Sequence, residues 1–265
     1  MFFVGWIALT TWLTMTIQPI YYLPLWIIVG ALASFLAVVL FIVINVYTWF
    51  PLTKPDNRLK FKLTRSIAVF LDVFVLRIRL RIEGVENIPL TGRLTTYSNH
   101  KSYADPIILE HVIKRPTTYT PKTGVYKLPV VNKWLKSIGA FPIDRSSSRN
   151  TARAMVDAIR VVKAGMNMVI FPEGGIKDRH DNKMVAMRAG AYKVAMKAKA
   201  DLLPITLMNT IEIKHRAPFR RTIVKAIVHP VVPYEKVKDM TTAEIGEYMF
   251  QIINAPFHDK KKTLI

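Results

Sequence analysis

The chain has 265 residues, no cysteine, and a formal net charge of +20 from 38 Lys and Arg against 18 Asp and Glu. The lack of cysteine excludes a disulfide framework, a cysteine nucleophile and a thiolate metal site. The strong positive charge predicts an anionic partner, for which nucleic acid and an anionic membrane surface are the two candidates.

The N-terminal region favours the membrane. No charged side chain occurs before Lys54, and residues 25–50 are apolar for longer than the roughly 20 residues that cross a bilayer. Residues 2–17 form a shorter, Thr-richer apolar stretch, and Pro19 and Pro24 separate the two. We predict a hydrophobic helical hairpin, the alternative being one span preceded by an interfacial or re-entrant helix. A signal peptide fits poorly, because a basic n-region is missing and the stretch is too long.

A basic segment follows the apolar region. Its cations outnumber the single Asp56 and are Lys54, Arg58, Lys60, Lys62 and Arg65. The positive-inside rule predicts that this side, and everything after it, is cytoplasmic. The cations can be a solvated flank, can contact anionic headgroups at about 1 kcal/mol each, or both.

Strands and helices alternate along most of residues 77–233. We expect strands at 77–84, 93–99, 117–122, 201–209 and 222–232, one ending in 140–145, and one before the glycines of 166–175. We expect helices at 59–76, 107–114, 129–139, 149–165, 187–200 and 241–253. This alternation predicts an α/β fold with a mixed or mostly parallel central sheet flanked by helices. The predicted domains are membrane-anchoring helices at 1–52, a basic interfacial segment at 53–76, a main domain at 77–257 and a basic tail at 258–265.

The segment "SNHKSYADP", residues 98–106, places His100 five positions before Asp105, after a predicted strand. Pro106 suits the first position of a helix, so we expect Asp105 to be its N-cap. A carboxylate beside an imidazole fixes its tautomer and stabilises the imidazolium, which predicts a general base and its orienting partner. The alternative is a capping Asp with an unrelated surface His, which the pattern alone favours.

Three further segments bear on chemistry. In "GAFPIDRS", residues 139–146, Arg145 can hold a phosphate bidentately or pair with Asp144. In "VIFPEGG", residues 169–175, Glu173 can accept hydrogen bonds from a polyol or hold a tight turn. In "LLPITL", residues 202–207, an acyl groove is possible, although ordinary core is the stronger interpretation. The chain has no G-x-S-x-G, P-loop or G-x-G-x-x-G motif, so His100 would activate a substrate hydroxyl directly.

Taken together and in order, "NHKSYADP", "GAFPIDR", "FPEGG" and "LLPITL" resemble the four sequence blocks of the glycerolipid acyltransferases with the HX4D motif. The resemblance covers roughly residues 77–233, and its closest branch is the 1-acylglycerol-3-phosphate acyltransferases. It implies that His100 is the general base and Asp105 its partner.

The resemblance also implies a phosphate-binding set. Arg145 and the turn of Glu173 and Gly174 would bind the acceptor's glycerol phosphate, and Lys122 is a second candidate. The third block departs from the family pattern, which continues with Thr and then Arg, because Gly175 and Ile176 stand there. Lys177 or Arg179 can substitute, and this departure bears on the identity of the acceptor more than on the reaction.

The expected reaction follows from that resemblance. It is acyl transfer from acyl-CoA or acyl-carrier protein to the 2-hydroxyl of lysophosphatidate, at the cytoplasmic side of the cell membrane, without a metal or organic cofactor. The rivals are an HX4D acyltransferase acting on glycerol-3-phosphate or another lysophospholipid, and a non-enzymatic protein that binds anionic lipid. The uncharged N-terminus argues against nucleic acid as a partner.

Overall fold

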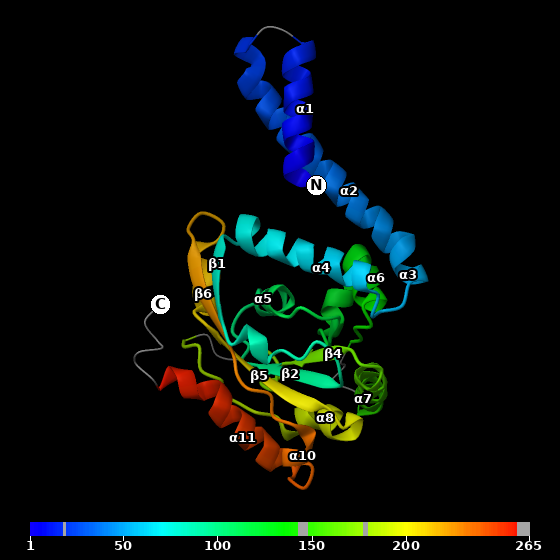
Figure 1. Cartoon of the computed structure of the whole chain (residues 1–265), viewed down its shortest axis with the longest axis vertical. Coiled ribbons are helices and arrows are strands. Elements are labelled where there is room, and N and C mark those ends of the chain that lie inside the picture. Colours follow the sequence, from blue (N-terminus) through cyan, green and yellow to red (C-terminus); the bar gives the residue numbers. More distant parts are fainter. Residues whose placement is uncertain (18–19, 143–147, 177–179, 259–265) are drawn as a thin grey trace. The chain divides into compact units, whose positions relative to one another are not determined.

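The computed structural model describes residues 1–17, 20–142, 148–176 and 180–258. The chain divides into two compact units, one of residues 1–54 with 128–137 and the other of residues 55–127 with 138–265 (Figure 1). The domain boundaries expected from the sequence stay predictions.

The first unit contains the predicted hydrophobic hairpin. Helices α1 (Phe2–Thr16) and α2 (Leu23–Tyr47) lie side by side in Figure 1. The indole Nε1 of Trp6 donates to the carbonyl of Ile27 at 2.9 Å. A Cβ on Gly30 would lie 2.5 Å from Thr10 Oγ1, so this glycine lets the helices approach closely. The hairpin prediction is therefore confirmed.

The second helix of the hairpin is long enough to cross a membrane. With α3 (Trp49–Leu52) it gives a 30-residue helical stretch, Leu23–Leu52, whose most apolar part has a mean hydropathy of 3.1. Helix α1 is apolar but has only 15 residues. Helix α6 (Pro129–Ser137), far along the chain, joins this unit. There the ring of Trp134 meets Phe50 edge-on with centroids 6.1 Å apart.

The second unit is built on one six-stranded sheet with the order β1-β6-β5-β2-β4-β3. The strands are β1 (Ile78–Glu83), β2 (Leu94–Ser98), β3 (Thr117–Tyr119), β4 (Asn167–Ile170), β5 (Asp201–Met208) and β6 (Thr222–Val228). All neighbouring pairs are parallel except β5 with β6. The predicted mixed, mostly parallel sheet is confirmed.

Helices cover both faces of the sheet (Figure 1). One face carries α5 (Asp105–Val112), against which α4 (Arg58–Phe70) and the π-helical turn Leu71–Val75 pack. The other carries α7 (Ser148–Lys163), α8 (Lys193–Ala198) and α11 (Thr242–Asn254). The remaining short helices are α9 (Ile213–Arg216) and α10 (Tyr234–Val237), with 3₁₀ turns at Ile20–Tyr22, Val85–Asn87, Thr123–Lys127, Ala189–Tyr192, Thr210–Glu212 and Ala255–Phe257.

Strand β5 shows why "LLPITL" is core. Leu202 packs with the α7, α8 and α11 layer, whereas Leu203 and Ile205 face the α5 layer, and all three are buried. A strand covered on both faces is expected to be continuously apolar. Pro204 is unusual in a central strand, and its carbonyl accepts the N–H of His229 at 3.0 Å. The core interpretation is confirmed, and these residues do not line a groove.

The structure corrects three local predictions. Residues 140–142 are not a strand, and the rest of the strand predicted to end at 145 lies outside the described residues. The helix predicted at 187–200 is a 3₁₀ turn followed by α8. Lys60, expected to be solvated or to contact headgroups, is buried, because it shares the inward stripe of α4 with Thr64 and Ala68 at four-residue spacing. The capping box of Thr241 and Glu244 is confirmed.

Candidate active site

The site is built at the carboxyl end of β2, between β5 and β4 in the sheet. Asn99, the first residue after the strand, is buried and fastens this end to β5. Its Nδ2 donates to the carbonyl of Leu207 at 2.7 Å, and the N–H of Leu207 donates back to its Oδ1 at 2.8 Å. The next residue, His100, therefore leaves a rigid strand end. Sequence reasoning missed Asn99, whose only signal was its place beside His100.

His100 and Asp105 contact each other. Nδ1 of His100 lies 3.0 Å from Asp105 Oδ2, which also accepts the N–H of Lys101 at 2.7 Å and of Ser102 at 2.8 Å. The imidazole stacks on the ring of Phe171, with centroids 4.1 Å apart and planes 20° apart. Because a carboxylate accepts, Nδ1 carries the proton and Nε2 keeps its lone pair. The pair has the geometry of a general base with its orienting partner.

Asp105 does not cap its helix as predicted. The N-cap of α5 is Ala104, and Asp105 is the first helical residue. Its carboxylate instead turns back to the loop, where the two backbone N–H groups hold it. The aspartate thus shapes the loop and contacts the imidazole at the same time.

Glu173 of the "FPEGG" segment holds the His100 loop from the other side. Its Oε1 accepts the backbone N–H of His100 at 2.7 Å, and its Oε2 lies 3.4 Å from Lys101 Nζ. Both side chains of this ion pair are fully buried. Burial raises the pKa of Glu173, while the His100 N–H and the Lys101 ammonium oppose that shift. Of the two roles expected for Glu173, holding the loop is the one seen in this geometry. Sequence reasoning missed Lys101, because nothing in the sequence distinguishes a buried lysine from an exposed one.

The glycines after Glu173 form the turn that the sequence predicted. Gly174 and Gly175 have φ of 76° and 139°, values that favour glycine. The exposed Lys122 lies over this turn, since a Cβ on Gly175 would be 3.9 Å from its Cε.

The structure thus brings together all five of the candidate site residues that it describes. His100, Asp105, Glu173, Gly174 and Lys122 gather at this end of the sheet. Arg145, Lys177 and Arg179 lie outside the described residues.

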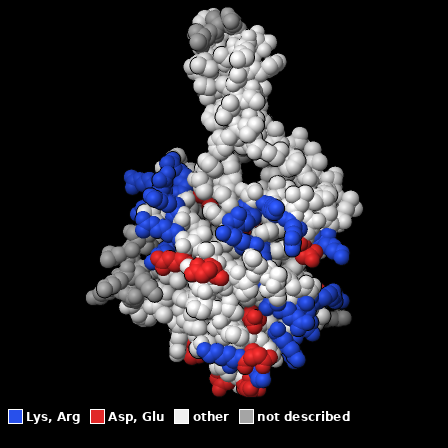
Figure 2. Space-filling view, viewed as in Figure 1, with Lys and Arg blue, Asp and Glu red and all other residues white. Residues whose placement is uncertain are grey.

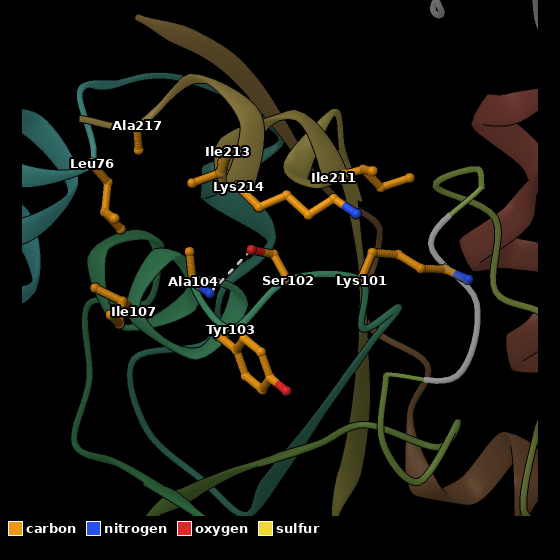
Figure 3. A pocket seen from close by; sticks show the side chains of 10 residues that line it. All are labelled: Leu76, Lys101, Ser102, Tyr103, Ala104, Ile107, Ile211, Ile213, Lys214 and Ala217. Atoms are coloured by element: carbon orange, nitrogen blue, oxygen red, sulfur yellow. Dashed lines mark hydrogen bonds between the residues drawn. The ribbon is translucent and has the colours of Figure 1, made fainter. Parts of the chain in front are cut away.

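A pocket of about 280 Å³ lies beside the His100 loop (Figure 3). One wall is formed by residues 101–104, the four residues between His100 and Asp105. The remaining walls are mostly apolar and include Leu76, Ile107, Ile211, Ile213 and Ala217. In Figure 3 the Lys101 side chain points away from these apolar groups. The pocket offers an apolar chain a place next to the imidazole loop.

No group of three or more His, Asp or Glu residues that could hold a metal ion occurs in the ranges that the structure describes. The chemistry available from the described groups is proton transfer at His100 Nε2, beside cations that can bind an anion.

The residues of this site lie in a segment that matches known proteins. Residues 79–208, which include the His100 loop and the Glu173 turn, match the family described as Acyltransferase. These residues belong to the acyltransferase family. The chain is 31% identical over 153 residues to the 1-acyl-sn-glycerol-3-phosphate acyltransferase of Borreliella burgdorferi, covering 58% of this chain and 60% of that one. It is 30% identical over 133 residues to a chloroplastic 1-acyl-sn-glycerol-3-phosphate acyltransferase of Arabidopsis thaliana, covering 50% and 36%. The matched segment thus spans less than two thirds of these relatives.

The acyltransferase fold is also similar to a solved structure. The crystal structure of the 1-acyl-sn-glycerophosphate acyltransferase PlsC from Thermotoga maritima superposes with a TM-score of 0.64 at 20% identity. The match covers 76% of this chain and 79% of that one. At this identity it supports the fold of the acyltransferase rather than its substrate.

Proposed function

We propose that the protein is a membrane-bound 1-acyl-sn-glycerol-3-phosphate acyltransferase, which moves a fatty acyl group to the 2-hydroxyl of lysophosphatidate and produces phosphatidate. The observation that carries this proposal is the 3.0 Å contact of His100 with Asp105 beside an apolar pocket. The matched relatives with this printed activity supply the substrate.

His100 acts as the general base. Its Nε2 takes the proton of the acceptor hydroxyl as that oxygen attacks the thioester carbonyl. Asp105 Oδ2, 3.0 Å from Nδ1, stabilises the imidazolium that forms. The new C–O bond forms, the C–S bond breaks, and the proton passes from Nε2 to the departing thiolate.

The phosphate of the acceptor binds at the Gly174 turn. Lys122, whose side chain lies beside Gly175, is the described cation best placed to hold it. Arg145, Lys177 and Arg179 complete this set in the proposal. Glu173 serves as a positioning residue, since its carboxylate binds the His100 loop.

The donor is acyl-CoA or acyl-carrier protein, and its acyl chain occupies the pocket beside residues 101–104. The apolar stretch Leu23–Leu52 anchors the enzyme in the membrane, with the active site on the cytoplasmic side. Acceptor and product then both remain in the lipid phase.

The deciding experiment is acyl transfer by the full-length protein in detergent. Acyl-CoA and acyl-carrier protein are supplied in turn with lysophosphatidate, glycerol-3-phosphate or lysophosphatidylglycerol, and His100→Ala is run beside the parent chain. We expect phosphatidate from lysophosphatidate and a loss of about 10²–10⁴-fold in the variant. Absence of transfer with every pair, from folded protein, would contradict the proposal and favour a non-enzymatic lipid-binding protein.

A second acceptor is favoured by one observation. Gly175 and Ile176 stand where the family usually has Thr and Arg, so an arginine contact to the phosphate is missing at this position. The alternative function is acylation of glycerol-3-phosphate or another lysophospholipid through the same His100 chemistry. Preference for either acceptor in the same assay would establish it.

A further inference from the structure

Residues 214–221, "KHRAPFRR", run from α9 into the connection to β6 and form an exposed basic segment with an aromatic tip, which we call the basic loop. It contains four Lys and Arg residues and no acidic residue. The side chain of Phe219 is 86% exposed, and Arg220 and Arg221 beside it are also exposed. A single exposed apolar side chain is ordinary in a soluble protein. A nearly bare phenylalanine among arginines fits a partner that accepts an apolar group and cations together.

Topology places the basic loop at the catalytic edge of the sheet. Strand β5 runs parallel to β2 and ends at Met208, on the edge where β2 delivers the His100 loop. Strand β6 returns antiparallel and begins at Thr222 on that same edge. The basic loop lies between these two strand ends and contributes Lys214 and Ala217 to the pocket wall.

A second exposed apolar segment lies beside the basic loop. The N–H of Thr222 donates to the carbonyl of Arg77 at 3.1 Å, and Leu76 lines the same pocket as Ala217 (Figure 3). The π-helical turn just before Leu76 exposes three consecutive apolar residues, of which Phe74 is 53% exposed. Two exposed phenylalanines therefore stand a few residues from one pocket.

Cations surround these two apolar tips. Arg77 and Arg79 are exposed at the start of β1, which pairs with β6 directly after the basic loop. Figure 2 shows a basic cluster at the upper left, where Figure 1 places the paired N-terminal ends of β1 and β6. The ion pair of Arg216 with Glu212, 3.4 Å, engages one cation of the loop.

We propose that the basic loop inserts Phe219 into the interface of an anionic phospholipid bilayer, with Arg220 and Arg221 on the lipid phosphates. Apolar side chains at the acyl boundary and cations at the headgroups are the pattern of interfacial binding. A free phosphate or an acidic protein surface would engage the arginines but leaves the bare phenylalanine unexplained.

Insertion of the basic loop would hold the pocket wall formed by Ala217 and Leu76 at the lipid surface, where a lysophospholipid lies. This inference rests on the membrane association in the proposed function, but not on acyl transfer. A protein that inserts the loop need not be a catalyst, and an active enzyme need not insert it.

The first test uses the absence of cysteine from the chain. Full-length Phe219→Cys is labelled with an environment-sensitive fluorophore and reconstituted in phosphatidylcholine vesicles with phosphatidylglycerol, with and without a quencher on the lipid acyl chains. Leu90→Cys is the matched control, because Leu90 is 71% exposed in the connection from β1 to β2, at the opposite edge of the sheet. We expect a blue shift and lipid quenching at position 219 and neither at position 90.

The second test removes charge. In the labelled Phe219→Cys protein, Arg220→Gln with Arg221→Gln should reduce quenching in anionic vesicles to its level in pure phosphatidylcholine. Lys197→Gln with Lys199→Gln, two exposed lysines before β5, should leave quenching unchanged. Equal effects of both double variants would overturn the specific role of the loop.

Equal quenching at positions 219 and 90 would overturn the proposal. It would also be overturned if the fluorescence of the label at 219 did not change with vesicles but changed with added acyl-carrier protein. Thermal unfolding of each labelled protein shows whether it is folded. Acyl transfer in detergent, measured on the same samples, reports the proposed function separately. We expect Phe219→Cys to retain it.

Discussion

Glu173 accepts the backbone N–H of His100 at 2.7 Å and lies 3.4 Å from the ammonium of Lys101. This contact ties two sequence segments 73 residues apart into one loop structure. Glu173 and Lys101 form a buried ion pair. Removing one partner would leave an unpaired buried charge, which destabilises the folded state.

We predict that Glu173→Gln strongly destabilises the protein. Glutamine can still accept the His100 N–H, but Lys101 is left as a buried, unmatched cation, at a cost of about 3–5 kcal/mol in the free energy of unfolding. Adding Lys101→Met should recover most of that loss, since both charges are then removed. Denaturant unfolding of the two single variants and the double variant measures the coupling. Simple additivity of the two losses would show that the ion pair is not their cause.

The same series tests the positioning role. If Glu173 acts through the His100 loop, the double variant should regain kcat together with stability, with KM for lysophosphatidate close to that of the parent. A double variant that is stable but has an unchanged kcat deficit would indicate direct contact of Glu173 with substrate.

Ile107 of α5 lines the pocket proposed for the acyl chain. We predict that Ile107→Trp fills this space and lowers kcat/KM for long-chain donors by about 10-fold or more, with a smaller effect on short-chain donors. Leu90→Trp, at the opposite edge of the sheet, is the control for an added indole. A uniform loss across chain lengths would mean that the acyl chain lies elsewhere.

Glu110 gives the stability of the fold a pH dependence. Burial raises its pKa from 4.5 to about 7, against the hydrogen bond from Tyr119 and the charge of Arg65. Because this carboxyl binds its proton more tightly when folded, its favourable contribution is complete below about pH 4.5 and is lost as pH rises through about 7. The cost at higher pH is on the order of 3 kcal/mol, since each pKa unit corresponds to about 1.4 kcal/mol.

We predict that Glu110→Gln removes this dependence, since the amide stays neutral and its oxygen can still accept the Tyr119 hydroxyl, which lies 2.7 Å from Glu110 in the parent chain. As pH rises across that window, the thermal unfolding temperature should fall more steeply in the parent chain than in the variant. Other titrating groups contribute equally to both, so identical slopes would refute a raised pKa at Glu110.

Arg115 stabilises the sheet at the N-terminal ends of β2 and β4, opposite the strand ends that carry the candidate site. Its guanidinium is buried and donates to the carbonyls of Pro89, Thr91, Gly92 and Gly165 at 2.5–3.0 Å. We predict that Arg115→Met lowers the free energy of unfolding by about 3–5 kcal/mol, because four part-buried carbonyls lose their donor. Arg115→Lys should recover little, since a single ammonium cannot reproduce the planar fork.

Unfolding of these variants is compared with that of Lys114→Met, which removes an exposed neighbouring cation. The activity of the folded fraction should be unchanged in all three, because His100 lies at the other edge. A selective loss of activity in Arg115→Met would link the two edges of the sheet.

Much of the site was visible in the sequence because it depends on local spacing. The five-residue separation of His100 and Asp105 puts both in one short loop, and their contact at 3.0 Å follows from that loop. The glycines after Glu173 likewise form their turn through their own φ values. The buried, continuously apolar β5 and the capping box at Thr241 are also local patterns.

Other features depended on packing between distant segments. Asp105 was expected to cap α5, but its carboxylate instead accepts hydrogen bonds from the backbone N–H groups of Lys101 and Ser102. Lys60 was expected to be solvated or to contact lipid headgroups, but the inward stripe of α4 buries it. The identity of a basic residue in the sequence does not indicate whether it will be paired, buried or exposed, because that depends on the packing of distant segments.

The sequence by itself determined the close spacing of His100 and Asp105, the alternation of strands and helices, and the apolar hairpin, because spacing and hydrophobic period act over a few residues. Only the tertiary structure decided that Glu173 holds the His100 loop and that the basic loop lies beside the same pocket. Those relationships join residues far apart in the chain, and they arise when parallel and antiparallel strand ends meet at one edge of the sheet.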